Sequence, residues 1–114
     1  MALPEVTMKL VEKSLGDFCE HRVPPHARKQ VRLSFGFQDE IVTLFEERVV
    51  YNDATRWTKM PIARFHFNLE DKTWSLFCCD RNEKWHYYDR VKPSRTFNHL
   101  LKEVENDPTH IFWG

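Results

Sequence analysis

This chain of 114 residues has few glycines and few cysteines, no long apolar run and a formal net charge of zero. The 3 glycines leave no glycine-rich loop that could cradle a phosphate. The 3 cysteines are an odd number and do not form a disulfide framework, so we expect reduced thiols and a cytoplasmic location. No apolar run reaches the roughly 18 residues that span a membrane, and we expect no membrane partner.

Charge is balanced, with 17 Lys and Arg against 17 Asp and Glu, which argues against a dedicated nucleic-acid protein because such domains are usually basic. The N-terminus lacks the positive region and apolar stretch of a secretory signal. A hydrophobic content of 41% is enough for a real core. The length predicts a single domain over residues 1–114.

Apolar periodicity predicts one helix at each end of the chain. The first runs from Leu3 to about His21, and its apolar stripe consists of Met8, Val11, Leu15 and Phe18. The second is capped by Ser94 and its stripe consists of Phe97, Leu100, Leu101 and Val104. The apolar end of the chain, Ile111–Gly114, is expected to dock on the core or on a partner.

Between the helices the period changes to two, which predicts strands. A turn at Gln38-Asp39 would place Leu33 opposite Leu44, and residues 51–59 form a longer connection. Residues 61–90 form two hairpins, with tips at Asp71-Lys72 and at Asn82-Glu83. The second tip would place Cys79 directly opposite His86.

These elements predict an α+β fold: an N-terminal helix, a five-stranded antiparallel meander and a C-terminal helix. Both helices cover one sheet face. The other face is the candidate binding surface, because it combines aromatic, cationic and imidazole side chains. Its candidate residues are Arg32, Arg64, His66, Phe77, Cys79, His86 and Tyr88, with Phe45 beside them. The first hypothesis is therefore a non-enzymatic binding or adaptor module whose partner is another protein.

Two alternatives stay open. The basic connector over residues 22–32 carries Arg22, His26, Arg28, Lys29 and Arg32, which with nearby rings would suit single-stranded RNA. Alternatively, Cys79 and His86 could form a metal or thiol site. The chain has no Cys-x-x-Cys pair and no identifiable oxyanion hole. We therefore lean against an enzyme and assign no catalytic residue, metal ligand or cofactor. The oligomeric state is not predicted.

Several blocks of the chain resemble a family of small, single-domain bacterial proteins of unknown function. These blocks are 18–20, 22–28, 44–48, 85–89 and 111–114, which contain the sequences FCE, RVPPHAR, LFEER, WHYYD and IFWG. The resemblance runs over nearly the whole chain. It implies a bacterial source and supplies no activity and no catalytic residue.

Overall fold

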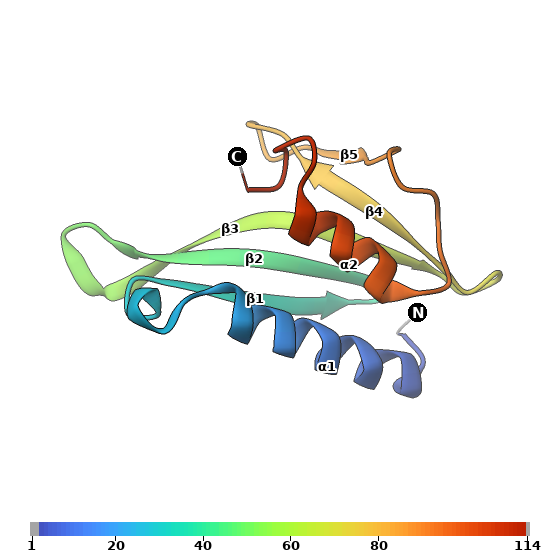
Figure 1. Ribbon diagram of the computed structural model, residues 1–114, viewed down its shortest axis with the longest axis horizontal. Helices are drawn as coiled ribbons and strands as arrows, with labels where there is room; N and C mark the ends of the chain where they lie inside the picture. The colour runs from blue at the N-terminus through green and yellow to red at the C-terminus, as the bar shows by residue number, and fades with distance from the viewer. Residues whose placement is uncertain (1–2, 114) are drawn as a thin grey trace.

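An antiparallel sheet with two helices on one of its faces forms the protein, as the computed structural model in Figure 1 shows for residues 3–113. The strands are β1 (Val31–Gln38), β2 (Ile41–Val50), β3 (Asp53–Asn68), β4 (Thr73–Cys79) and β5 (Trp85–Tyr87), and they pair in chain order. The helices are α1 (Glu5–Arg22) and α2 (Phe97–Asn106), with a short 3-10 helix, η1 (Pro25–Ala27), after α1. The predicted α+β fold is confirmed.

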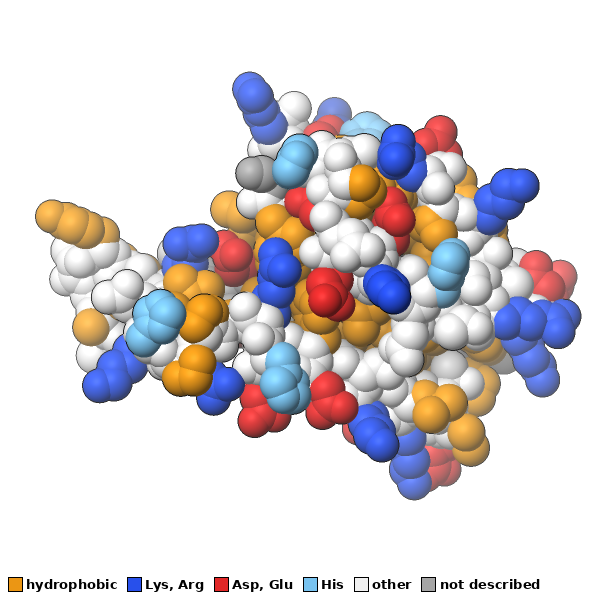
Figure 2. All heavy atoms as spheres, in the orientation of Figure 1, with side chains coloured by type: hydrophobic (Ala, Val, Ile, Leu, Met, Phe, Trp, Pro, Cys, Tyr) orange, Lys and Arg blue, Asp and Glu red, His pale blue; other side chains and the backbone are white. Residues whose placement is uncertain are grey.

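The hydrophobic core lies between the helices and one sheet face. Phe65, Leu76 and Leu44 have no exposed surface and form its sheet side. The helices contribute Val11, Leu15, Leu100 and Val104, which are the predicted stripe positions. Figure 2 views the molecule from this side and shows apolar side chains gathered in the middle of it. The amphipathic helix pattern therefore places both helices correctly.

Two hairpins have turns that differ from those predicted. The β1–β2 turn lies at Asp39-Glu40, so Phe35 rather than Leu33 opposes Leu44. Asp39 has φ +54°, a left-handed conformation that aspartate tolerates. In the β3–β4 hairpin all of residues 69–72 lie in the turn, and the register there also moves by two. A shift of two residues keeps every side chain on its predicted face.

Residues 53–59 belong to β3, and the prediction of a long connection over 51–59 is wrong. β2 and β3 continue together past the end of β4 to the pair formed by Val50 and Asp53, and β1 stays paired with β2 as far as Arg48; we call this extension the β2–β3 ribbon. Tyr51 at the ribbon tip is fully exposed. The ribbon extends away from the core, so neither of its faces shows the apolar alternation that marks a half-buried strand.

Hydrogen bonds join the C-terminal end of α2 to the tail of the chain. Asp107 ends the helix at φ +43°, and its carboxylate accepts the N–H groups of Phe112 at 3.1 Å and Trp113 at 2.9 Å. The Trp113 indole donates to the Val104 carbonyl at 2.8 Å. The expected docking on the core is confirmed for Phe112, while Gly114 lies outside the described residues.

The prediction that Ser94 caps α2 is wrong, because the N-cap is Thr96. Ser94 instead forms a β-bridge with Trp74. Its carbonyl accepts the Trp74 N–H at 2.7 Å, and its own N–H donates back to the Trp74 carbonyl at 3.0 Å. The segment that leads into α2 is therefore hydrogen-bonded to β4 before the helix begins.

Candidate functional site

The sheet face opposite the helices carries side chains from all five strands. Side chains alternate along a strand, so the neighbours of the buried core residues point to this outer face. The register aligns one row across four strands, from Thr43 of β2 through Arg64 of β3 and Phe77 of β4 to Tyr87 of β5. Both helices and the described part of the tail pack on the other side of the sheet.

Three cations of the outer face lie over aromatic rings. The distance from the charged group to the ring centroid is 4.0 Å for Arg32 over Trp57, 4.4 Å for Lys59 over Phe45, and 4.4 Å for Arg64 over Trp85. All three distances lie within the roughly 6 Å over which a ring quadrupole attracts a cation. The rings therefore hold the cations at defined places on the surface.

A second group of rings continues the same surface towards the β3–β4 turn. His66 stacks on Phe77 with ring centroids 4.0 Å apart, and Phe77 meets Tyr87 edge-on at 5.6 Å. Tyr87 is 47% exposed. These three rings and the three cation–ring pairs form what we call the outer-face stripe: Arg32, Phe45, Trp57, Lys59, Arg64, His66, Phe77, Trp85 and Tyr87.

The surroundings of His66 in the stripe favour the neutral form of its imidazole ring. Burial lowers the pKa of His66 below its ordinary value of 6.5, and the nearby positive charge of Arg64 lowers it further, while Glu40 partly opposes both effects. Within residues 3–113 the buried Nε2 atom has no hydrogen-bond partner. A proton on this ring would therefore be poorly solvated in the folded protein.

We expect the free energy of unfolding to fall as the pH is lowered from 7 through the folded-state pKa of His66. The unfolded chain binds a proton near pH 6.5, whereas the folded chain binds it only at lower pH, so acid favours unfolding. His66→Phe should keep the stacking on Phe77 and flatten this dependence. Denaturant unfolding at a series of pH values between 5 and 8 measures it.

His66→Gln provides a second variant without a titrating ring. It should show the same flattened pH dependence even where its absolute stability differs from that of His66→Phe. An unchanged pH dependence in both variants would contradict the assignment to His66.

The predicted outer face is correct for four strands and wrong for the fifth. Arg32, Arg64, His66, Phe77 and Cys79 lie on it as predicted. His86 and Tyr88 do not, because β5 is displaced by one residue from the predicted register, and such a displacement reverses its faces. Cys79 opposes Trp85, and His86 opposes Cys78.

The β4–β5 turn explains this displacement. Residues 80–84 all lie in the turn, and an odd number of turn residues reverses the faces that an even number would give. The Asp80 carboxylate organises the turn, because it accepts the N–H groups of Asn82 at 2.8 Å and Lys84 at 2.9 Å. Its other oxygen lies 2.7 Å from Nε2 of His86, and this hydrogen bond lowers the pKa of Asp80.

Tyr88 is part of the hydrophobic core and not of the outer face. Its side chain is 5% exposed, and its hydroxyl donates to Glu103 of α2 at 2.6 Å. Its ring lies 5.0 Å from that of Phe112. Tyr88 therefore joins the sheet edge to α2 and to the tail, on the side away from the outer face.

The thiols are not activated. Burial raises the pKa of Cys78 and Cys79, with the charge of Asp80 adding to the effect at Cys79, and burial raises the pKa of Cys19 to about 11. A protonated thiol is a poor nucleophile and a poor metal ligand. Within residues 3–113 no three His, Cys, Asp or Glu side chains gather where they could hold a metal ion. The proposed pairing of Cys79 with His86 is also absent, so the geometry gives no support to a metal or thiol site.

The structure does not gather the basic connector into one surface. The Arg22 guanidinium lies 4.6 Å from the Trp113 ring on the helix side. Arg28 donates to the Glu20 carbonyl at 2.8 Å and so satisfies the end of α1. Arg32 lies on the outer face over Trp57, while His26 and Lys29 are exposed between them.

Sequence reasoning missed four residues of the stripe. Trp57 and Lys59 lie in the stretch interpreted as a connection, although their spacing of two is the strand period. Trp85 and Tyr87 were placed on the wrong face by the displaced β5 register. Their spacing of two was visible in the sequence, but the face depends on the turn length.

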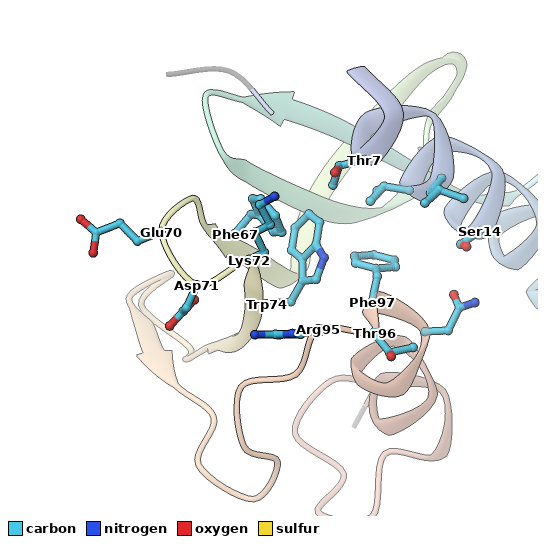
Figure 3. A pocket seen from close by; sticks show the side chains of 13 residues that line it. Thr7, Ser14, Phe67, Glu70, Asp71, Lys72, Trp74, Arg95, Thr96 and Phe97 are labelled. Carbon is cyan, nitrogen blue, oxygen red and sulfur yellow. The ribbon is translucent and has the colours of Figure 1, made fainter. Parts of the chain in front are cut away.

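A cleft on the helix side is the second candidate surface. It has a volume of about 570 Å³ and lies between the start of α1, the β3–β4 turn and the start of α2. Figure 3 shows Phe67, Trp74 and Phe97 at its centre, with Arg95 below them. The charges around it, which include Asp71 and Lys72, have both signs, so this cleft shows no clear charge preference.

The sequence of the chain decides its family. Residues 3–114 match the sequence model of a family described as a domain of unknown function, DUF3024. The chain belongs to DUF3024. The predicted membership of a family of unknown function is therefore confirmed, while a bacterial source and a cytoplasmic location stay predictions.

Comparisons with curated proteins and with solved structures give no information on the activity of this DUF3024 chain. No curated protein and no solved structure matches it. Among the described residues of this DUF3024 protein, neither helix has the length and apolar character needed to cross a membrane.

Proposed function

We propose that the protein is a non-enzymatic binding module that holds a negatively charged partner on its outer sheet face. The observation that carries this proposal is the set of three cation–ring pairs on the face that the helices leave uncovered. Core packing does not require them, because the buried hydrophobic residues of the same strands lie on the opposite face.

The cation–ring pairs lower the entropic cost of binding a partner. A long cationic side chain loses rotamer freedom when it binds, at a cost of about 0.5–1.5 kcal/mol for each side chain. A ring beneath the charge limits that freedom before binding, so less is lost in the complex. Lys59 and Arg32 remain exposed in this arrangement, and Arg64 is half-buried. Their positive charges are therefore positioned and reachable.

One acidic residue, Glu47, lies among them and offsets one of the three positive charges. Glu47 pairs with Arg32 at 3.1 Å, and its side chain is only 14% exposed. Lys59 and Arg64 each lie over a ring, with Arg64 also donating to the Thr43 hydroxyl at 3.3 Å. The exposed part of the stripe is therefore more positive than the chain as a whole, whose formal charge is zero.

Photo-crosslinking in the source cells tests the surface while the identity of the partner is still open. A benzoylphenylalanine at position 87, replacing the exposed Tyr87, should give a crosslinked species. The same group in place of exposed His99 on α2 serves as the control and should not give that species. Lys59→Gln with Arg64→Gln should reduce the yield by about 5- to 30-fold, because two charge contacts of about 0.5–1 kcal/mol each are lost.

Circular dichroism of the double variant must match that of the parent protein, so that the loss is one of binding. Absence of a crosslink at position 87, or equal crosslinks at positions 87 and 99, would contradict the proposal. A crosslink that survives removal of both cations would also contradict it.

A further inference from the structure

The cations and rings of the outer-face stripe follow one another along the sheet. Arg32, Glu47 and Lys59 occupy one row across β1, β2 and β3. Arg64 lies five residues further along β3, which corresponds to roughly 16 Å in an extended strand. Tyr87 and Phe77 continue from Arg64 in the next strands. The positive charges are thus spread along the sheet, with aromatic rings beside each one.

We infer that the stripe binds single-stranded nucleic acid, an inference that rests on the proposed function of the outer face. Arg32, Lys59 and Arg64 meet the phosphates. The rings of Tyr87 and Phe77 provide faces on which unpaired bases stack. Single-strand binders combine these two elements, a cationic track and stacking platforms.

The geometry favours a single strand over a duplex. Bases in a duplex are stacked on one another, so their faces are not available to side chains. A splayed single strand can lie along the sheet and present its bases to the rings.

The geometry also favours a nucleic acid over an acidic protein. An acidic peptide would use the positive charges alone, whereas the stripe places flat π surfaces beside them. The exposed Tyr87 ring is held edge-on against Phe77 at 5.6 Å, and Phe77 is stacked on His66 at 4.0 Å. A ring supported in this way is a platform for another flat group.

Fluorescence anisotropy with a 5′-fluorescein-labelled 12-nucleotide oligouridylate tests the inference. Three phosphate contacts on a single strand predict a slope of log Kobs against log salt of about −2. Affinity should therefore fall roughly 20-fold between 50 and 200 mM salt. A 12-base-pair duplex serves as the competitor and should displace the labelled strand poorly.

Three variants separate charge from stacking. Lys59→Gln should reduce the magnitude of the salt slope by about 0.7, the value of one phosphate contact. Tyr87→Ala should weaken binding by about tenfold with the slope unchanged, since a stacked base is lost. Lys102→Gln removes an exposed lysine from α2 and should change neither quantity.

The outcomes distinguish this inference from the proposed function. No binding at 50 mM salt, or binding that Tyr87→Ala and Lys59→Gln leave unchanged, would overturn the inference. Tighter binding to polyglutamate than to the oligouridylate would overturn it in favour of an acidic protein partner. If the oligouridylate fails while the crosslink at position 87 still appears and still needs Lys59 and Arg64, only the nucleic-acid inference falls.

Discussion

Phe65→Ala is expected to lower the free energy of unfolding by about 3–5 kcal/mol, the usual cost of removing a large ring from a tight core. Phe65 has no exposed surface, and its ring centroid lies 4.7 Å from that of Phe97 on α2. The cavity would open at the contact between the centre of the sheet and the second helix. Denaturant unfolding followed by far-ultraviolet circular dichroism measures the loss.

Phe77→Ala is the matched control, because Phe77 lies in the same hairpin on the opposite face. Its ring is only partly buried, and its removal should cost less than about 2 kcal/mol. A loss as large as that of Phe65→Ala would mean that the outer face is packed as tightly as the core. It would then be no candidate for binding a partner.

Asp107→Ala is expected to lower the free energy of unfolding by about 2–4 kcal/mol, because two hydrogen bonds to a charged acceptor are lost. The Asp107 carboxylate is buried and accepts both the Phe112 and Trp113 N–H groups. Alanine is also poorly suited to the φ of +43° at this position. Thermal and denaturant unfolding measure the change, and faster proteolysis of the tail should accompany it.

Asp107→Asn separates the backbone effect from the hydrogen bonds. Asparagine tolerates the left-handed conformation and keeps one carbonyl oxygen, so it should lose about half as much as alanine. Equal losses in the two variants would contradict this account of the tail. A loss below about 0.5 kcal/mol in the alanine variant would contradict it as well.

The helices were predictable because their buried positions are large and regularly spaced. Val11 and Leu15 in α1, and Leu100 and Val104 in α2, are buried at the positions that the period of 3.6 indicates. The faces of β1 to β4 were predictable for a related reason. Their registers differ from the predicted ones by two residues, and a shift of two leaves each face unchanged.

The candidate site was less predictable because it depends on turn length and on pairing between distant strands. β5 contains only Trp85–Tyr87, too few residues to show which face is apolar. The conformation of the turn around Asp80 decides its face, and that conformation involves left-handed Glu83. The contact of Arg32 with Trp57 depends on the β2–β3 ribbon, which has no apolar alternation to reveal it.

The local stability of β3 differs between its two ends. Its end near Phe65 is buried under two helices, whereas its beginning at Asp53 adjoins the fully exposed Tyr51. Backbone amides in the buried part can exchange with solvent only when much of the protein opens, while those near the tip exchange after local fraying. Arg32, Trp57 and Lys59 therefore lie nearer to the end of the sheet whose amides exchange first, while Arg64 and Phe77 lie beside the core. A partner bound along the whole stripe should therefore slow amide exchange near the β2–β3 tip more than in the buried part of β3.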